Sequence, residues 1–224
     1  MNQKGLRHEL KYTISPQNAE EIVSRLKHAA WIDENANPDG SYQVHSLYFD
    51  NIYDKALREK LDGVNLRHKY RLRYYNGDLS FIRLEKKSKI NGLCKKESLF
   101  LTREDCRRLL QGETQFLLSR GEPLAADFYS KLQTEALRPK NIVGYRRRAF
   151  VYEPGGVRVT LDDHIHSRSV TGDFFHPAEP GIPVHGTILE IKYDAFLPQL
   201  IADLVQTPNS RTEAFSKYAA ARIF

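Results

Sequence analysis

Short runs that alternate between apolar and polar residues dominate the chain, and they predict many antiparallel strands. Successive side chains of a strand point to opposite faces, so a half-buried strand shows a period of two. Residues 66–75 (LRHKYRLRYY) alternate clearly, and the turn signal Asn76-Gly77 joins them to a second strand at residues 79–88. Further strands are predicted at residues 7–14, 43–50, 94–101, 142–153, 156–161 and 187–193.

Helix start and stop signals lie between these strands. Ser15 can cap a helix that begins at Pro16 and runs to about Ala30, because proline is favoured at the first helical position. Thr102 can cap another helix at residues 103–111. The other predicted helices span residues 53–61, 125–137, 197–205 and 211–223. Many antiparallel strands with helices packed outside them predict an α+β barrel in a single domain, residues 1–224.

Charged residues follow the same period of two along the predicted strands. Lys69, Arg71 and Arg73 share one face of their strand, and the residues between them are mostly apolar. An acid-x-base pattern recurs in three strands, at Glu9-x-Lys11, Glu85-x-Lys87 and Glu190-x-Lys192. Two more strands place Arg147 with Tyr145, and Arg158 with Thr160 and Asp162. Each of these strands therefore has one apolar and one charged face.

The outer helices decide which face points inward. They need an apolar surface to pack on, so the charged face is expected to line the interior of the barrel. Unpaired buried charges are too costly, so such an interior must hold water and counter-charge. An oligophosphate offers many acceptor oxygens, and carboxylates among the cations suggest Mg²⁺ or Mn²⁺. The alternative is a solvated sheet face on which acids and bases pair across strands.

Composition narrows the class of protein further. Lys and Arg total 34 against 28 Asp and Glu, a net charge of +6 that suits an anionic partner without selecting nucleic acid, phospholipid or nucleotide. The two cysteines, Cys94 and Cys106, form no metal or redox motif. No signal peptide or membrane-spanning run is present, so we expect a soluble cytoplasmic protein that contacts membranes only through a partner.

Other motifs are interpreted as structural. No P-loop or GxSxG motif occurs. His164 and His166 are expected at the surface rather than on a metal. In the run at residues 146–148, the period of two places Arg147 inside and its neighbours outside, which argues against a nucleic-acid patch. Trp31 and Phe116 are expected in the core.

Several segments taken together resemble the VTC domain of the triphosphate tunnel metalloenzyme (CYTH-like) superfamily. The similarity runs from RHELKY at residues 7–12 to FSKY at residues 215–218. Between them lie SLYFDN (46–51), KYRLRYY (69–75), LEKK (84–87), GYRRRAF (144–150), VRVTLD (157–162) and ILEIKY (188–193). Each motif is weak alone, but their order and number make the resemblance specific.

The resemblance implies an antiparallel eight-stranded β-barrel tunnel that transfers the γ-phosphate of ATP to inorganic polyphosphate. It implies Mn²⁺ or Mg²⁺ held by Glu190, with Glu9 or Glu85 assisting, and no nucleic-acid partner. The implied catalytic residues are Arg71, Arg73, Lys87, Arg147, Arg158 and Glu190. The implied phosphate-binding residues are Lys11, Arg71, Arg73, Lys87, Lys96, Tyr145, Arg147, Arg158, Ser216 and Lys217.

The chain also departs from its relatives. The hydrolase branch of the superfamily carries ExExK on its first strand, whereas this chain has Arg7 at the first position. That difference favours a polymerase over a hydrolase of tripolyphosphate or nucleoside triphosphate. A non-catalytic polyphosphate-binding module is the third interpretation. The SPX domain and membrane helices of eukaryotic relatives are not in this sequence.

Overall fold

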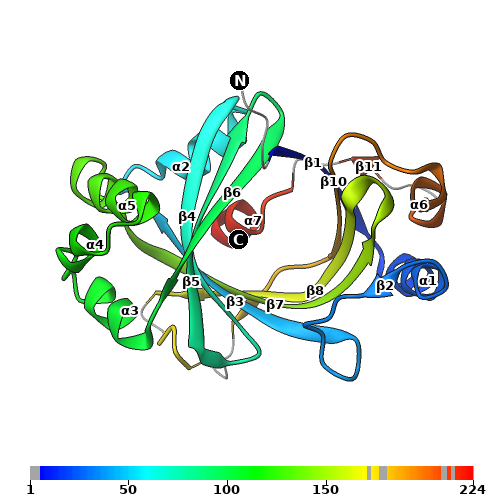
Figure 1. Cartoon of the computed structure of the whole chain (residues 1–224), viewed down its shortest axis with the longest axis horizontal. Coiled ribbons are helices and arrows are strands. Elements are labelled where there is room, and N and C mark those ends of the chain that lie inside the picture. The colour runs from blue at the N-terminus through cyan, green and yellow to red at the C-terminus, as the bar shows by residue number, and fades with distance from the viewer. Residues whose placement is uncertain (1–5, 171–172, 177–180, 208–210, 213–214, 224) are drawn as a thin grey trace.

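Antiparallel pairing joins eight strands of the computed structural model into a closed ring (Figure 1). The structure describes residues 6–170, 173–176, 181–207, 211–212 and 215–223. Around the ring the order is β7 (Arg138–Tyr152), β3 (Ser41–Asp50), β4 (Leu66–Tyr75), β5 (Asp78–Ile90), β6 (Leu93–Leu101), β1 (Leu6–Ile14), β10 (Thr187–Tyr193) and β8 (Val157–Ser169). Because β8 also pairs with β7, each of the eight strands pairs on both sides, although β1 and β6 are joined only at Leu6 with Lys95 and Arg7 with Cys94.

Local turn chemistry forms the two hairpins of the ring that the sequence predicted. Asn76 and Gly77 have φ values of 51° and 73° between β4 and β5, as the predicted Asn-Gly turn requires. A short 3₁₀ turn, η1 (Pro154–Gly156), joins β7 to β8. Three short strands extend the sheet: β2 (Trp31–Ile32) pairs with β7, β9 (Ile182–Pro183) with β8, and β11 (Arg211–Thr212) with β1.

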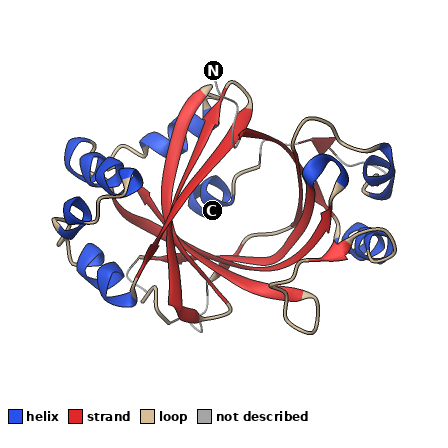
Figure 2. Cartoon of the chain, viewed as in Figure 1, coloured by secondary structure: helices blue, strands red, loops and turns tan. Residues whose placement is uncertain are grey.

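Seven helices lie among the described residues (Figure 2). They are α1 (Pro16–Leu26), α2 (Lys55–Leu61), α3 (Arg103–Leu110), α4 (Phe116–Ser119), α5 (Pro123–Thr134), α6 (Gln199–Leu204) and α7 (Lys217–Ile223). The Ser15 side chain accepts a hydrogen bond from the Asn18 amide, and Thr102 forms a capping box with Asp105. Within this part of the chain, none of the helices is long and apolar enough to cross a membrane.

Two apolar clusters cover the outside of the ring. On one side, Leu72 and Leu84 of the sheet pack with Leu109 of α3 and Phe128 of α5. On the other side, Ile191 of β10 belongs to a cluster formed with α1 and α6. Figure 1 shows these two groups of helices at opposite ends of the molecule. The predicted arrangement, with the apolar face toward the helices, is confirmed here.

A third cluster lies on the inner face, where the period of two had predicted charge. Tyr48 of β3 and Tyr145 of β7 point inward and are buried with Tyr218 of α7. The rings of Tyr48 and Tyr218 have centroids 5.2 Å apart. The interior is therefore partly apolar, because α7 packs against one stretch of it.

Some predicted elements were wrong in extent. The first helix ends at Leu26 rather than near Ala30, because the chain then turns into β2, which pairs with β7. Residues 211–223 do not form one helix: residues 211–212 pair with β1, and α7 begins at Lys217. Trp31 is not in the core but 77% exposed on β2, whereas Phe116 packs partly buried against a core cluster.

Candidate functional site

The inner faces of β4 and β5 bring together arginines and one buried carboxylate. Glu85 is fully buried, and Arg71 donates to its Oε2 at 2.7 Å through Nε. Arg71 also donates to the Tyr48 hydroxyl at 3.1 Å. Arg73 lies farther from Glu85, at 3.8 Å, and donates to the hydroxyl of Tyr145 at 3.0 Å. These arginines are thus fixed in place by partners from neighbouring strands.

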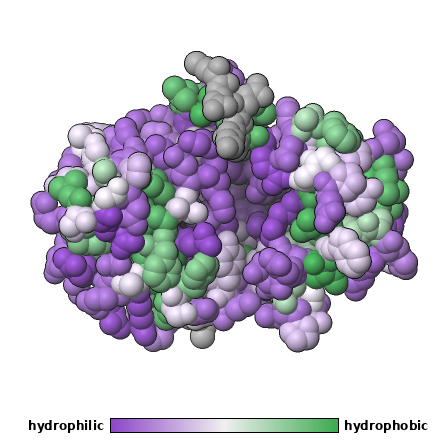
Figure 3. Space-filling model, viewed as in Figure 1, coloured by the Kyte–Doolittle hydropathy of each residue, from purple (hydrophilic) through white to green (hydrophobic). Residues whose placement is uncertain are grey.

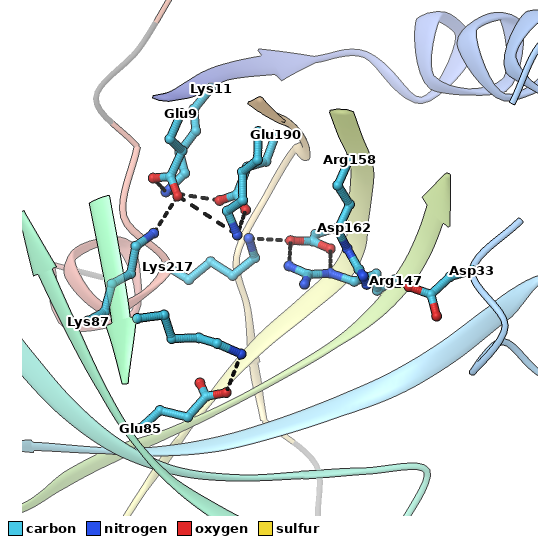
Figure 4. Close-up of polar contacts among 12 residues, drawn as sticks. Glu9, Lys11, Asp33, Glu85, Lys87, Arg147, Arg158, Asp162, Glu190 and Lys217 are labelled. Atoms are coloured by element: carbon cyan, nitrogen blue, oxygen red, sulfur yellow. Dashed lines mark hydrogen bonds and ion pairs between the residues drawn. The ribbon is translucent and has the colours of Figure 1, made fainter. Parts of the chain in front are cut away.

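A second group forms around Asp162 of β8. Its carboxylate is fully buried and accepts two hydrogen bonds from Arg147, at 2.6 and 2.7 Å, in the fork geometry that arginine favours. Lys217, the first residue of α7, lies 2.5 Å from the same carboxylate. Figure 4 shows the three side chains converging from β7, β8 and α7.

A third group lies where β1, β10 and β5 face one another (Figure 4). Lys11 lies between two carboxylates, 2.8 Å from Glu9 and 3.1 Å from Glu190. Lys87 lies 2.5 Å from Glu9, and Lys192 lies 2.6 Å from Glu190. Two carboxylates and three amines therefore share this part of the interior.

Two predicted site residues lie at the edges of this charged interior. Arg158 is 33% exposed and pairs with Asp33, which precedes β3, at 2.5 Å. It also donates to the hydroxyl of Tyr42. Lys96 has a side chain that is 56% exposed and reaches Glu85 at 3.4 Å. Both can meet a ligand near the ends of the interior rather than at its centre.

An open cavity of about 270 Å³ adjoins the third group. Glu9, Lys11, Lys69, Lys87 and Ser216 belong to its lining. Figure 3 shows that the visible rim of the central hollow on this face is mainly hydrophilic. The cavity thus combines several amines, a hydroxyl and a carboxylate in one space.

Neighbouring cations keep the interior carboxylates ionised. Burial raises the pKa of Asp162, but Arg147 and Lys217 outweigh that effect and lower it to about 2. Burial is likewise outweighed at Glu190 by the surrounding lysines, and at Glu85 mainly by arginines, so both pKa values fall below the usual range. These acids remain charged throughout the neutral range.

The pKa values of the interior lysines shift in both directions. Burial acts to lower the pKa of Lys11, but its two carboxylate partners outweigh burial and raise it. Burial lowers the pKa values of Lys87 and Lys217 despite their carboxylate partners. Burial and neighbouring cations also lower the pKa of Lys69, to about 7.

The structure corrects one premise drawn from the sequence. The inward cations do not depend on an outside anion alone, because the chain provides Glu9, Glu85, Asp162 and Glu190 as buried counter-charges. Sequence reasoning missed the partner roles of Asp162 and Asp33. It placed Lys69 on the inward face of its strand, as observed, but did not name it among the phosphate-binding residues. The shared strand face of Arg158 and Asp162 was a usable signal. Asp33 lies outside the long strands, so the strand pattern gave no signal of its pairing with Arg158.

The acids of the third group fit a divalent metal. Lys11 contacts both Glu9 and Glu190, so the two carboxylates flank the position of its amine, which a bound metal would have to share or displace. Mg²⁺ commonly takes one or two carboxylates together with phosphate oxygens. Glu85 lies elsewhere, with Arg71 as its nearest partner. No cluster of three His, Cys, Asp or Glu side chains suited to a metal occurs among the residues described, so phosphate oxygens would have to complete the ligand set.

The two histidines do not join the site. The His164 side chain is 73% exposed and bonds to Asp163, as expected for a surface residue. His166 packs over Gly144 on the outer side of the ring. Arg146 and Arg148 also point outward and pair with Asp163, whereas Arg147 points inward as predicted.

The fold and the site define a protein that gathers basic side chains and their counter-ions inside a ring of strands. Residues 6–223 match the VTC domain family. Because this match spans nearly the whole sequence, the chain belongs to the VTC domain family, as its motifs predicted. No curated protein matches the sequence.

Comparison with solved structures finds similar chains at low sequence identity. A candidate adenylate cyclase from Bacillus halodurans has a TM-score of 0.51 and 15% identity, over 84% of this chain and 81% of that chain. A Pyrococcus horikoshii protein has a TM-score of 0.43 and 13% identity, over 89% and 84% of the two chains. A conserved hypothetical protein from Pyrococcus furiosus has a TM-score of 0.46 and 10% identity, over 89% and 85%. The first of these likenesses shows a common fold.

Proposed function

We propose that this chain is a metal-dependent polyphosphate polymerase, a single domain of residues 1–224 whose ring encloses a tunnel for a phosphate chain. The observation that supports this most is the convergence of cations from separate elements on one interior. Lys11, Arg71, Lys87, Arg147 and Lys217 come from β1, β4, β5, β7 and α7. A linear oligophosphate carries negative charge along its whole length and matches such a row of donors.

The proposed reaction needs positioning and charge neutralisation rather than a protein nucleophile. A terminal oxygen of the polyphosphate chain attacks the γ-phosphorus of ATP. The bond to the β–γ bridging oxygen breaks, and ADP leaves. Arg71, Arg73, Lys87, Arg147 and Arg158 would hold and neutralise the phosphates on both sides of the transferred group.

The remaining predicted residues take supporting roles. Lys11, Lys96 and Lys217 would bind phosphates along the chain. Tyr145 and Ser216 would add neutral hydrogen bonds. Glu190, with Glu9 beside it, would hold Mn²⁺ or Mg²⁺, whose charge would further neutralise phosphate oxygens.

The decisive experiment is incubation of the purified protein with ATP and Mn²⁺. Long-chain polyphosphate together with ADP is the expected product. Inorganic phosphate alone would indicate the hydrolase instead. Tight polyphosphate binding without turnover would indicate a non-catalytic module. Tripolyphosphate should displace any bound RNA, because the proposed site recognises phosphate and not bases.

We further propose the cytoplasm as the site of this activity, with membranes contacted only through a partner. Cys94 and Cys106 are both free thiols, which suits a reducing compartment. Fractionation of cells that carry a tagged chain would test this location. Recovery in the soluble fraction is the expected result.

A further inference from the structure

Lys69 differs from the other amines that line the cavity beside Glu9. Its side chain extends inward from β4 and is partly buried. Lys11 and Lys87 each contact a carboxylate, whereas none of the ion pairs in the described part of the chain involves Lys69. Its nearest polar partner is the hydroxyl of Ser216, to which it donates at 3.3 Å. A partly buried amine therefore faces the cavity without a carboxylate partner.

The surroundings of Lys69 make this situation unfavourable. Lys87 lies directly opposite on β5, and like charges at opposed positions of a sheet repel. The aromatic ring of Tyr48 lies below the amine, with its centroid 5.6 Å from Nζ, and provides only a weak attraction. An anion in the cavity would supply the charge that is missing.

Resting on the proposed function, we infer that Lys69, Lys87 and Ser216 form a phosphate subsite whose occupation draws a proton onto the Lys69 amine. All three residues line the same cavity of about 270 Å³. The amine would bind a phosphate oxygen as an ammonium, and the proton would come from solvent. Binding at this subsite is thus coupled to pH, in contrast to binding at the arginines, which are always charged.

Most of the charged groups around Lys69 disfavour its protonated form. They come from β1, β3, β4 and β5, and they are the cations Lys11, Arg71 and Lys87 and the opposing Tyr48. Burial and the cations Lys87, Lys11 and Arg71 lower the pKa of Lys69 to about 7, against the attraction of Tyr48. Burial raises the pKa of Tyr48, but Arg71, Lys69 and Arg73 outweigh it and lower that pKa to about 7. An incoming phosphate would favour the protonated form of both groups.

Calorimetric titration with tripolyphosphate, in EDTA and at about pH 8, tests the inference. The protons taken up per ligand follow from the dependence of the binding heat on the ionisation enthalpy of the buffer, for example Tris against HEPES. Lys69→Arg carries a permanent positive charge and cannot change its protonation. The wild type should take up about half to one proton more than this variant per bound ligand. Changes in the ligand's own protonation cancel in the difference.

Two further variants sharpen the test. Lys86→Gln changes the next amine of β5, which points outward to Asp127 at 2.8 Å, and should leave proton uptake unchanged. Tyr48→Phe should keep the uptake if the amine carries the proton. If Lys69→Arg does not fold, Lys69→Gln should bind about tenfold more weakly than the wild type at pH 7, with the two affinities converging toward pH 9.

The outcomes separate the inference from the proposed function. Equal proton uptake in the wild type and in Lys69→Arg would overturn the inference and leave a phosphate tunnel intact. Loss of uptake in Tyr48→Phe alone would assign the proton to the tyrosine and overturn the inference too. Absence of tripolyphosphate binding would overturn both.

Discussion

Single residues show how far a strand pattern can predict a site. The period of two correctly placed Arg147 inside and Arg146 outside, although the two are adjacent in a run of arginines. The pattern could not identify their partners, because Asp162 and Asp163 alternate in the same way on the neighbouring strand. Pairing depends on the register between β7 and β8, which tertiary structure determines.

We expect Arg147→Ala to lose activity on the order of 100-fold or more, because a preorganised cation beside the phosphates disappears. The buried carboxylate of Asp162 would keep only Lys217, so unfolding free energy should fall by about 3 kcal/mol. Initial rates and urea unfolding measure both effects. Arg146→Ala is the matched control and should keep its activity, with a stability change below about 1 kcal/mol. Equal loss of activity in both variants would contradict the proposal that Arg147 acts from inside the ring.

Glu190→Gln should abolish the stimulation by Mn²⁺ together with turnover, since the amide is a much weaker metal ligand than the carboxylate. Initial rates over a Mn²⁺ titration measure this. Glu97→Gln is the control, because the Glu97 side chain is 40% exposed and pairs with Lys95 at the surface. Full wild-type activity in EDTA would rule out the metal.

Acid should weaken the fold through Asp162. Its pKa of about 2 in the folded chain lies below the ordinary value of 3.8, so its ionised form stabilises the fold above about pH 4 and loses this effect as the pH falls toward 2. The stability difference between the wild type and Asp162→Asn should therefore shrink by about 1 kcal/mol between pH 5 and pH 3. Urea unfolding at both pH values measures it. A stability difference that is the same at both pH values would contradict the lowered pKa of Asp162.

At the scale of elements, the C-terminal segment was the least predictable part. Its alanines and basic residues are typical of a helix, and α7 does form at Lys217–Ile223. What the sequence does not reveal is that this helix packs on the inner face of the ring. Tyr218 donates to the buried carboxylate of Asp50 at 2.6 Å, and Asp50 also accepts from amides at the start of α2. The local sequence pattern around Tyr218 does not predict such long-range contacts.

Tyr218→Phe should lower the unfolding free energy by about 1–2 kcal/mol, because Asp50 loses one hydrogen bond but keeps its amide donors. It should also raise KM for ATP, since Lys217 and Ser216 are positioned by the start of α7. Thermal unfolding and steady-state kinetics measure the two effects. Tyr129→Phe removes a hydroxyl that binds Gln115 on the outer side and should leave KM unchanged. A rise in KM in both variants would argue against α7 as the cause.

Across the whole molecule, the closed order of strands was beyond sequence reasoning. The charge pattern of individual strands predicted that their inner faces are polar, but not that β3 pairs with β7 or that β1 pairs with both β6 and β10. Ring closure depends on pairing between residues far apart in the chain, for example Leu10 with Ile191. The pattern predicted the eight strands themselves, and the family resemblance supplied their arrangement around a tunnel.

Binding of an oligophosphate should stabilise the molecule as a whole, since the convergent cations exist only in the folded state. Tripolyphosphate at about one hundred times its dissociation constant should raise Tm by about 5–10 °C. Differential scanning fluorimetry in EDTA measures the shift. Sodium sulfate at matched ionic strength should have a much smaller effect. Equal shifts with both salts would indicate general screening only.

The closure of the ring has a consequence for any long guest. Paired strands surround it except beside the short contact between β1 and β6, where only Leu6 with Lys95 and Arg7 with Cys94 are paired, so it slides lengthwise more easily than it escapes sideways. A growing product would then remain bound in the tunnel between successive additions of phosphate. The enzyme that we propose would therefore work processively and make a few very long products, not many short ones.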